Sequence, residues 1–209
     1  MLIERIIWNI VWCLMIRPFP RQKACKWEIF LLRLFGAQVD YSCTIYSSAK
    51  IWLPRNLKMD QYATIADHVE ILNSVLVYLK EHSRVSQYSY ICPGSHDISE
   101  LTLPGISEPI IIGEWAWVTS KCYIGMGVKI GRGSVISAGS VVFNNVPPYS
   151  VVMGNPAKIV GYRYTPKEVL QLEKNLFREE YRLSADVLER NYEKFYISRI
   201  GDIIKYIKI

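Results

Sequence analysis

Cysteine and histidine are scarce in this sequence, with five of the first and three of the second among 209 residues. The five cysteines are an odd number, and no two of them are spaced as C-x-x-C. This pattern argues against a disulfide framework and against a structural zinc site. We therefore expect a reducing compartment, the cytoplasm.

The N-terminal part also lacks an apolar run long enough to cross a membrane. Its apolar run, residues 6–16, is shorter than the roughly 20 residues that a spanning helix needs, and no cleavage site of a secretory signal follows it. We expect residues 1–36 to form a helical segment packed on the rest of the protein. The alternative is a helix lying in a membrane interface and making peripheral membrane contact, with Trp8 and Trp12 at headgroup level. Four cations would then face acidic lipid: Arg17, Arg21, Lys23 and Lys26.

A further absence is any Lys/Arg-rich run with interleaved aromatic residues, and no nucleic-acid module is recognisable. We therefore expect no nucleic-acid partner. The net charge of +6 is modest and suits an anionic small molecule such as a phosphorylated cofactor, or an acidic membrane surface. Half of the residues are hydrophobic, which is enough for a sizeable core.

What the sequence does contain is a repeat of six residues. An aliphatic residue recurs at every sixth position: Ile112, Val118, Ile124, Ile130, Ile136 and Val142. Four places after each stands a small or slim residue: Ala116, Cys122, Val128, Ser134, Ser140 and Val146. This period fits neither an α-helix nor simple strand alternation. It predicts an all-β parallel β-helix, in which short strands and tight corners alternate around a narrow prism and neighbouring coils hydrogen-bond to each other.

The same period continues upstream in two registers. The first contains Val39, Ile45, Ile51, Leu57, Ala63, Val69 and Val75, and the second contains Leu79, Val85 and Ile91. The pattern lapses in residues 92–109, which carry three prolines and two glycines. We expect these residues to form a loop extruded from a β-helix of residues 37–163. Irregular loops on a rigid scaffold are where function tends to lie.

Residues 164–209 have the pattern of a helical extension. Thr165 stands where an N-cap is expected, Pro166 would be the first helical residue, and Glu168 can reach back to the cap. A second helix is expected from about Ser184. We expect the extension to cover the end of the prism or a neighbouring subunit.

Several segments resemble the hexapeptide-repeat acyltransferases, and within them the maltose and galactoside O-acetyltransferases and the acetyltransferases of colanic acid and other exopolysaccharide biosynthesis. They are residues 31–37, 51–57, 94–97, 112–118 and the run G-N-P-A-K at 154–158, which is highly specific for acyltransferases. The resemblance implies a left-handed parallel β-helix, a homotrimer with active sites between subunits, and acetyl-CoA as the donor.

The resemblance also implies a histidine base at the start of the extruded loop, where His96 stands. Chemistry agrees, because an alcohol attacks a thioester only if its proton is removed, and histidine suits that task near neutral pH. Asp97 could orient the imidazole or contact the acceptor. The resemblance places Asn73 at the acceptor, and the alternative is an asparagine stacked inside the coil.

For coenzyme A, the resemblance implies a groove between prisms in which small residues let the pantetheine arm approach the backbone. Its candidate residues are Trp117, Ser120, Ser137 and Ala138. Lys158 and Arg163 are candidates for the phosphates, against the alternative of a solvated basic surface.

The three histidines, His68, His82 and His96, lie fourteen residues apart. A zinc site would need three converging imidazoles. Fourteen is not a multiple of six, so His68 and His82 should lie on different parts of the prism. We therefore expect no metal.

The predicted function is acetyl transfer to a hydroxyl of a glycan, or of a nucleotide-linked or lipid-linked sugar, in polysaccharide biosynthesis. One alternative keeps the chemistry and changes the acceptor to an amino sugar, serine or an antibiotic. The other is a non-catalytic β-helix that serves as a scaffold.

Overall fold

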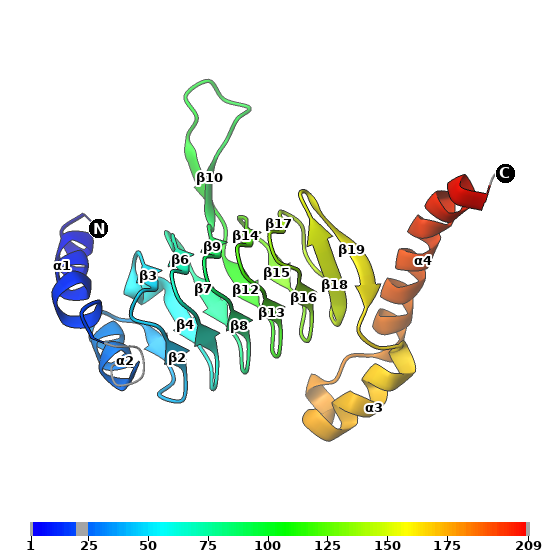
Figure 1. The fold of residues 1–209 in the computed structure, drawn as a ribbon, viewed down its shortest axis with the longest axis horizontal. Coiled ribbons are helices and arrows are strands. Elements are labelled where there is room, and N and C mark those ends of the chain that lie inside the picture. Colours follow the sequence, from blue (N-terminus) through cyan, green and yellow to red (C-terminus); the bar gives the residue numbers. More distant parts are fainter. Residues whose placement is uncertain (1, 20–24, 208–209) are drawn as a thin grey trace.

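The computed structural model describes residues 2–19 and 25–207. Its central part is a solenoid of short parallel strands, with helices at both ends and a hairpin that projects from one edge (Figure 1). The solenoid has three sides, and each side is one sheet to which every coil adds a strand.

From β1 to β17, apart from the separate pair β10 and β11, the strands of the three sheets follow one another in rotation. Sheet A consists of β1 (Gln38–Val39), β4 (Leu57–Met59), β7 (Val77–Leu79), β12 (Ile110–Ile112) and β15 (Lys129–Ile130). Sheet B consists of β2 (Thr44–Ile45), β5 (Thr64–Ile65), β8 (Arg84–Val85), β13 (Trp117–Val118), β16 (Val135–Ile136), β18 (Ser150–Gly154) and β19 (Ala157–Tyr162). Sheet C consists of β3 (Lys50–Ile51), β6 (Glu70–Ile71), β9 (Tyr90–Ile91), β14 (Tyr123–Ile124) and β17 (Val141–Val142). The aliphatic residue that ends each of the short strands β1–β9 and β12–β17 is buried, which confirms the predicted parallel β-helix.

The coils differ in length, and this difference changes the register. Ile112 pairs with Ile130, eighteen residues on, as three repeats of six require. Val39 pairs with Met59, twenty residues on, because the corner after β3 holds a short 3-10 helix, Pro54–Asn56.

The first predicted register is therefore wrong beyond Ile51. The strand-ending aliphatic residues of the second coil are Met59, Ile65 and Ile71. Ala63 and Val69 are buried at the small position of the corners instead, since two inserted residues shift every later position.

Aromatic rings stack along two different corners of the solenoid. His82 stacks on Tyr62 and on Trp115, with ring centroids 4.7 and 4.0 Å apart, at the corner that follows sheet A. His68 stacks on Tyr88 at the corner that follows sheet B. The two histidines thus lie on different parts of the prism, as predicted. Within the described ranges, no three His, Cys, Asp or Glu side chains are grouped as metal ligands.

Helices close the N-terminal end: α1 (Leu2–Val11), a π-helical turn (Trp12–Ile16) and α2 (Cys25–Leu34). Trp8 is buried, and its Nε1 donates to the carbonyl of Ile51 at 2.7 Å, while Trp12 Nε1 donates to Ala49 at 2.9 Å. The predicted packing on the protein is confirmed, and Trp8 and Trp12 do not stand at lipid headgroups, because their indole N–H groups bind the first coil. The membrane contact of the alternative stays a prediction. Of the four cations of that alternative, Arg17 and Lys26 are exposed, and Arg21 and Lys23 lie outside the described residues.

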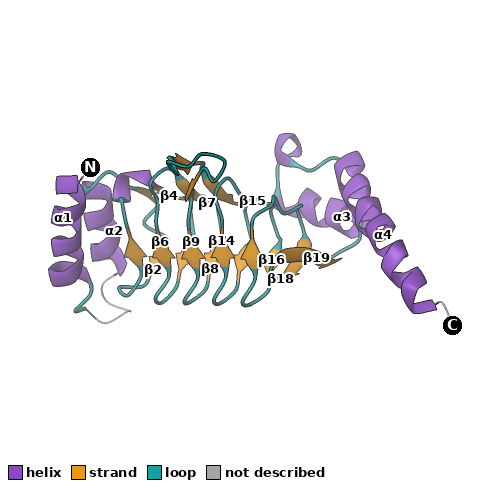
Figure 2. Ribbon diagram, turned by 90° about the horizontal axis from the view of Figure 1, so that it is seen from above, coloured by secondary structure: helices purple, strands orange, loops and turns teal. Residues whose placement is uncertain are grey.

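The C-terminal end is closed by the antiparallel β18–β19 hairpin and by α3 (Pro166–Leu176), a 3-10 turn (Glu179–Tyr181) and α4 (Ala185–Ile207) (Figure 2). α3 begins with the predicted capping box between Thr165 and Glu168. Among the described residues, no helix is both long enough and apolar enough to cross a membrane.

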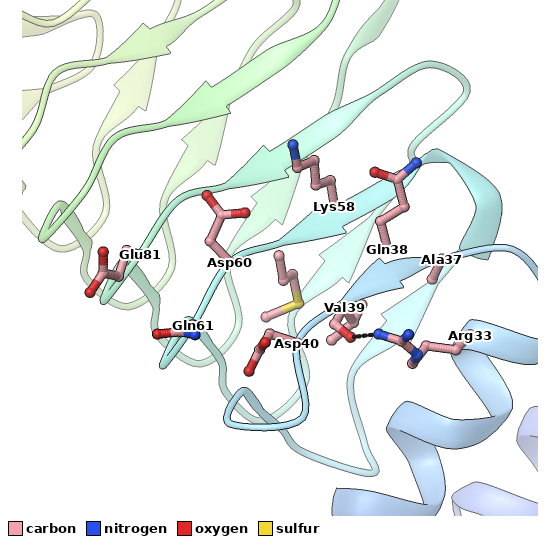
Figure 3. Close-up of a pocket in the computed structure, with 10 residues that line it drawn as sticks. Arg33, Ala37, Gln38, Val39, Asp40, Lys58, Asp60, Gln61 and Glu81 are labelled. Carbon is pink, nitrogen blue, oxygen red and sulfur yellow. Dashed lines mark hydrogen bonds between the residues drawn. The ribbon is translucent and has the colours of Figure 1, made fainter. Parts of the chain in front are cut away.

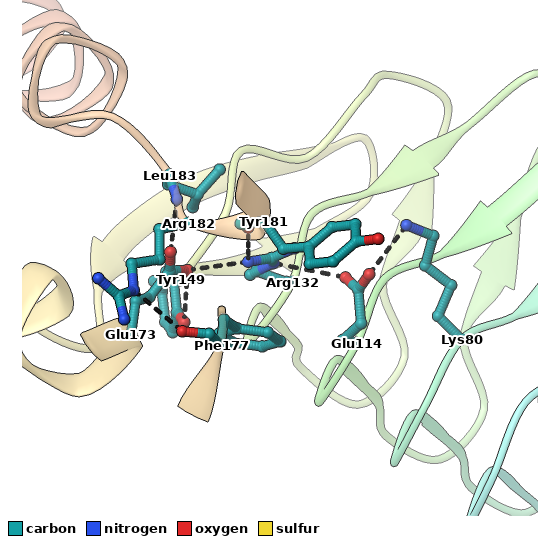
Figure 4. A network of polar contacts seen from close by, with 9 residues as sticks. All are labelled: Lys80, Glu114, Arg132, Tyr149, Glu173, Phe177, Tyr181, Arg182 and Leu183. Atoms are coloured by element: carbon teal, nitrogen blue, oxygen red, sulfur yellow. Dashed lines mark hydrogen bonds and ion pairs between the residues drawn. The ribbon is translucent and has the colours of Figure 1, made fainter. Parts of the chain in front are cut away.

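A charged network joins this extension to the solenoid (Figure 4). The guanidinium of Arg132 lies between Glu114, at 3.4 Å, and the buried Glu173 of α3, at 3.3 Å. Glu173 also accepts from the Tyr149 hydroxyl and from the backbone N–H of Leu183. The extension is therefore held by a carboxylate whose oxygens both have partners.

Candidate active site

The hairpin that projects from the solenoid consists of β10 (Gly94–His96) and β11 (Gly105–Ser107), which pair in antiparallel fashion. It lies between β9 of sheet C and β12 of sheet A, so it leaves from the edge where these two sheets meet (Figure 1). His96 stands at the outer end of β10, opposite Gly105.

The imidazole of His96 is exposed and held from one side. Its Nδ1 lies 2.7 Å from the backbone carbonyl oxygen of Leu103. A carbonyl only accepts, so Nδ1 carries the proton and the Nε2 of the neutral ring is an acceptor. This is the tautomer that a general base needs. Leu103 has a positive φ of 47°, and no sequence pattern pointed to its carbonyl as the partner of His96.

Asp97 lies beside His96 but is engaged within the loop. Its Oδ1 accepts from the hydroxyl of Ser99 at 2.6 Å and from the N–H of Ser99 at 2.9 Å. These bonds stabilise the carboxylate and lower the pKa of Asp97. The imidazole is therefore oriented by Leu103 rather than by Asp97, and the acceptor contact of Asp97 stays a prediction.

Asn73 is fully buried inside the coil. Its Oδ1 accepts from the N–H of Leu53 at 2.9 Å, and its Nδ2 donates to the carbonyl of Leu53 at 2.6 Å. The side chain thus has the structural role that was the alternative at this position, and it exposes no atom to an acceptor. The inserted corner residues explain the difference, because they bring Leu53 directly opposite Asn73.

Trp117 and Arg163, both predicted for the cofactor, line one cavity of about 200 Å³ on the sheet B side. Trp117 Nε1 donates to Ser86 at 2.9 Å, and Arg163 Nη1 donates to the carbonyl of Gly133 at 2.7 Å. Arg84 lines the same cavity, since it pairs with Trp117 across β8 and β13. Arg84 is not among the residues predicted from the sequence. The strand repeat could have placed it beside Trp117 had the loop been removed from the register.

The other predicted cofactor residues lie further along the solenoid. Ser120, Ser137 and Ala138 lie at the corner between sheets B and C, where Gly139 N–H donates to the carbonyl of Ser120. Lys158 of β19 lines a separate cavity of about 630 Å³, together with cations of α4. Lys158 and Arg163 therefore do not share a cavity.

His96 and the cavity of Trp117 lie on opposite sides of the solenoid. In a three-sided prism, the edge between sheets A and C is opposite sheet B. His96 leaves from that edge, whereas Trp117 belongs to sheet B and Arg163 directly follows its last strand. A single copy of the chain does not bring the base and this cavity together.

A further hollow of about 470 Å³ lies at the N-terminal end along sheet A (Figure 3). Its charged side chains are engaged locally. Arg33 donates to the carbonyl of Val39, Asp60 accepts from the Tyr78 hydroxyl, and the hydroxyl and N–H of Ser42 lower the pKa of Asp40. Neither a histidine nor any predicted site residue lines it.

Solved structures that superpose on this chain identify the class of its fold. No family model matches the chain. A hexapeptide-repeat acetyltransferase of Vibrio cholerae, solved with acetyl coenzyme A, superposes with a TM-score of 0.66 at 24% identity, covering 78% of this chain and 88% of that one. Galactoside acetyltransferase, solved with coenzyme A, gives a TM-score of 0.67 at 20% identity, covering 87% and 88%. These neighbours identify the class as the left-handed β-helix of hexapeptide repeats, as predicted.

Sequence similarity identifies the family. The acetyltransferase WcaF of Escherichia coli K12, which is assigned to colanic acid biosynthesis, is 38% identical over 138 residues, covering 66% of this chain and 76% of WcaF. The chain belongs to the hexapeptide-repeat acetyltransferases, which confirms the predicted resemblance.

Proposed function

We propose that this protein transfers the acetyl group of acetyl-CoA to a sugar hydroxyl of a glycan, or of a nucleotide-linked or lipid-linked intermediate, in polysaccharide biosynthesis. The observation that carries the proposal is the 38% identity to WcaF over three quarters of that protein. The hydrogen bond from His96 Nδ1 to Leu103 supports the chemistry, because it leaves Nε2 as an acceptor.

His96 acts as the general base in this proposal. Its Nε2 takes the proton of the acceptor hydroxyl as the oxygen attacks the thioester carbonyl. The new C–O bond forms, the C–S bond breaks, and the proton held by His96 passes to the coenzyme A thiolate as it leaves. The carbonyl of Leu103 keeps its bond to Nδ1–H throughout and stabilises the imidazolium that forms between the two steps.

The coenzyme A groove that we propose runs along the sheet B side. Trp117 and Arg163 share its cavity, which supports contacts with the pantetheine arm and a phosphate. Ser120, Ser137 and Ala138 follow at the adjoining corner, where small side chains leave the backbone accessible. Lys158, in a separate cavity, would serve a second phosphate.

The proposal includes a homotrimer in which the hairpin of one subunit meets the sheet B side of the next. It rests on the separation of His96 from Trp117 within one chain. Co-expression of His96→Ala with Trp117→Ala tests it, because mixed trimers contain intersubunit sites with both residues intact. We expect partial recovery of activity from two inactive variants, and no recovery would contradict shared sites. We place the reaction in the cytoplasm, which the free thiols of Cys13, Cys92 and Cys122 support.

The test of the function is release of coenzyme A from acetyl-CoA in the presence of a panel of sugars, nucleotide sugars, amino sugars, serine and chloramphenicol. We expect release that depends on a sugar hydroxyl, and a fall in kcat of about 10²- to 10⁴-fold in His96→Ala. His68→Ala is the matched control, because His68 is an exposed histidine on another corner.

Each alternative has its own result in this assay. Release only with amine acceptors would show that the enzyme acetylates an amine rather than a hydroxyl. Equal rates in His96→Ala and in the wild type would remove His96 from the mechanism. Absence of turnover, together with absence of coenzyme A binding in calorimetry, would favour the scaffold.

A further inference from the structure

The outward side of the N-terminal helices is unusually apolar. Six aliphatic side chains of α1 and the turn after it are between 48% and 72% exposed: Leu2, Ile3, Ile6, Ile7, Ile10 and Leu14. They recur at helical spacing, while Trp8 and Ile16 on the inward side are buried against the first coil. Single exposed apolar residues are common, but a continuous set of them marks a surface that binds another protein, a membrane or a ligand.

α2 extends the same surface. Trp27 and Phe30 are exposed and stack on each other with ring centroids 5.6 Å apart. Trp27 Nε1 donates to the carbonyl of Met15, an exposed residue that directly follows Leu14, so the two helices are tied together. We use the name N-terminal apolar face for Leu2, Ile3, Ile6, Ile7, Ile10, Leu14, Met15, Trp27, Phe30 and Leu34.

The charges around this face have one sign. Arg17 and Lys26 are exposed. The two acidic residues of α1 and α2 place no unpaired negative charge on this face, since Glu4 forms an ion pair with Arg55 at 2.7 Å and Glu28 is buried. A twofold contact between two copies would bring these cations toward their own equivalents, whereas anionic headgroups would neutralise them.

We propose that the N-terminal apolar face docks the protein on an anionic bilayer surface. The helix lies in the plane of the interface, with its isoleucines and leucines among the acyl chains and Arg17 and Lys26 at the headgroups. Trp8 and Trp12 stay bound to the first coil, so the helix docks without leaving the solenoid. The solenoid would then stand on the membrane by its N-terminal end, with the His96 hairpin directed to the side (Figure 1).

Vesicle flotation tests the proposal without reference to acetyl transfer, so its failure is distinct from failure of the proposed enzyme. The full chain is mixed with phosphatidylcholine vesicles, or with vesicles that also contain phosphatidylglycerol. We expect binding to the anionic vesicles to be at least tenfold tighter than to the neutral ones. We expect it to be at least tenfold weaker in the double variant Ile6→Glu, Ile10→Glu.

The matched control is Ile197→Glu, which changes an exposed isoleucine of α4 at the other end of the molecule. It should bind like the wild type. Both variants should keep the wild-type circular dichroism, because all the substituted side chains are exposed. Failure of the wild type to float, or equal binding to both vesicle types, overturns the proposal. A lower mass of the double variant in light scattering, without vesicle binding by the wild type, would assign the face to contacts between copies.

Discussion

Each end of the solenoid buries a glutamate, but the two carboxyl groups differ in their hydrogen-bond partners. Glu28 of α2 and Glu173 of α3 are both only 1% exposed. Glu173 is bonded through both oxygens, to Arg132, Tyr149 and Leu183. Oε2 of Glu28 is buried without a hydrogen-bond partner, and burial raises the pKa of this carboxyl to about 8.

This difference shows two ways to close the end of a β-helix, whose terminal coil would otherwise leave backbone groups unpaired. At the N-terminal end, indole N–H groups bind carbonyls of the first coil, and the outward surface is apolar. At the C-terminal end, an antiparallel hairpin continues sheet B, and buried charges hold the helices against it. A buried charge is tolerated only where it is fully partnered. The two ends should therefore respond in opposite directions when their glutamates are neutralised.

The largest effect is expected at the C-terminal end. Glu173→Ala leaves the guanidinium of Arg132, which is largely buried, without this carboxylate, and breaking a buried pair costs about 3–5 kcal/mol. We expect a loss of that size in the free energy of unfolding, measured by urea denaturation. The control is Glu180→Ala, at an exposed site of the same extension, where we expect a change within about 0.5 kcal/mol. A loss below about 1 kcal/mol in Glu173→Ala would mean that the network does not hold the extension.

The sequence predicted the regular coils well, because residues 112–142 repeat without insertion and periodicity alone sets which side chains point inward. It failed at the corner of Pro54–Asn56, where two extra residues leave the pattern of aliphatic residues almost intact and shift the register unnoticed. For the site, the sequence indicated His96 as the candidate base, but its partner is a backbone carbonyl, which has no residue type to detect. The ionic network was equally hidden, since it joins Arg132 to Glu173 across 41 residues.

The second prediction concerns the N-terminal end, where neutralising the buried glutamate should raise the free energy of unfolding instead of lowering it. The folded-state pKa of Glu28 is about 8, against 4.5 for an ordinary glutamate. Between these values the folded protein holds a proton that the unfolded chain has released, so stability falls by about 1.4 kcal/mol per pH unit as the pH rises. Glu28→Gln removes this dependence. We expect the variant to be more stable than the wild type by a few kcal/mol at pH 8, and nearly equal to it at pH 4.5.

Thermal unfolding between pH 4.5 and 8 measures this difference directly. The control is Glu168→Gln, because Glu168 is an exposed carboxylate whose pKa is lowered by hydrogen bonds with Thr165. Glu168→Gln should therefore be slightly destabilising at pH 8, the opposite of Glu28→Gln. Parallel stability curves for wild type and Glu28→Gln across this range would contradict the raised pKa.

The smallest effect concerns the indole that closes the first coil. Trp8→Phe keeps an aromatic ring beside Phe35 but removes the N–H that donates to Ile51, leaving a buried carbonyl unpaired. Such a loss costs about 1–3 kcal/mol. Trp115→Phe is the matched control, because Trp115 is exposed and its ring still stacks on His82 after the change. Hydrogen exchange should show the amides of β3 opening more often in Trp8→Phe, while those of β18 and β19 keep their protection, since β3 and the β18–β19 hairpin lie at opposite ends of the solenoid (Figure 1). Equal loosening at both ends would mean that the solenoid unfolds as one cooperative unit, and that its ends are not closed independently.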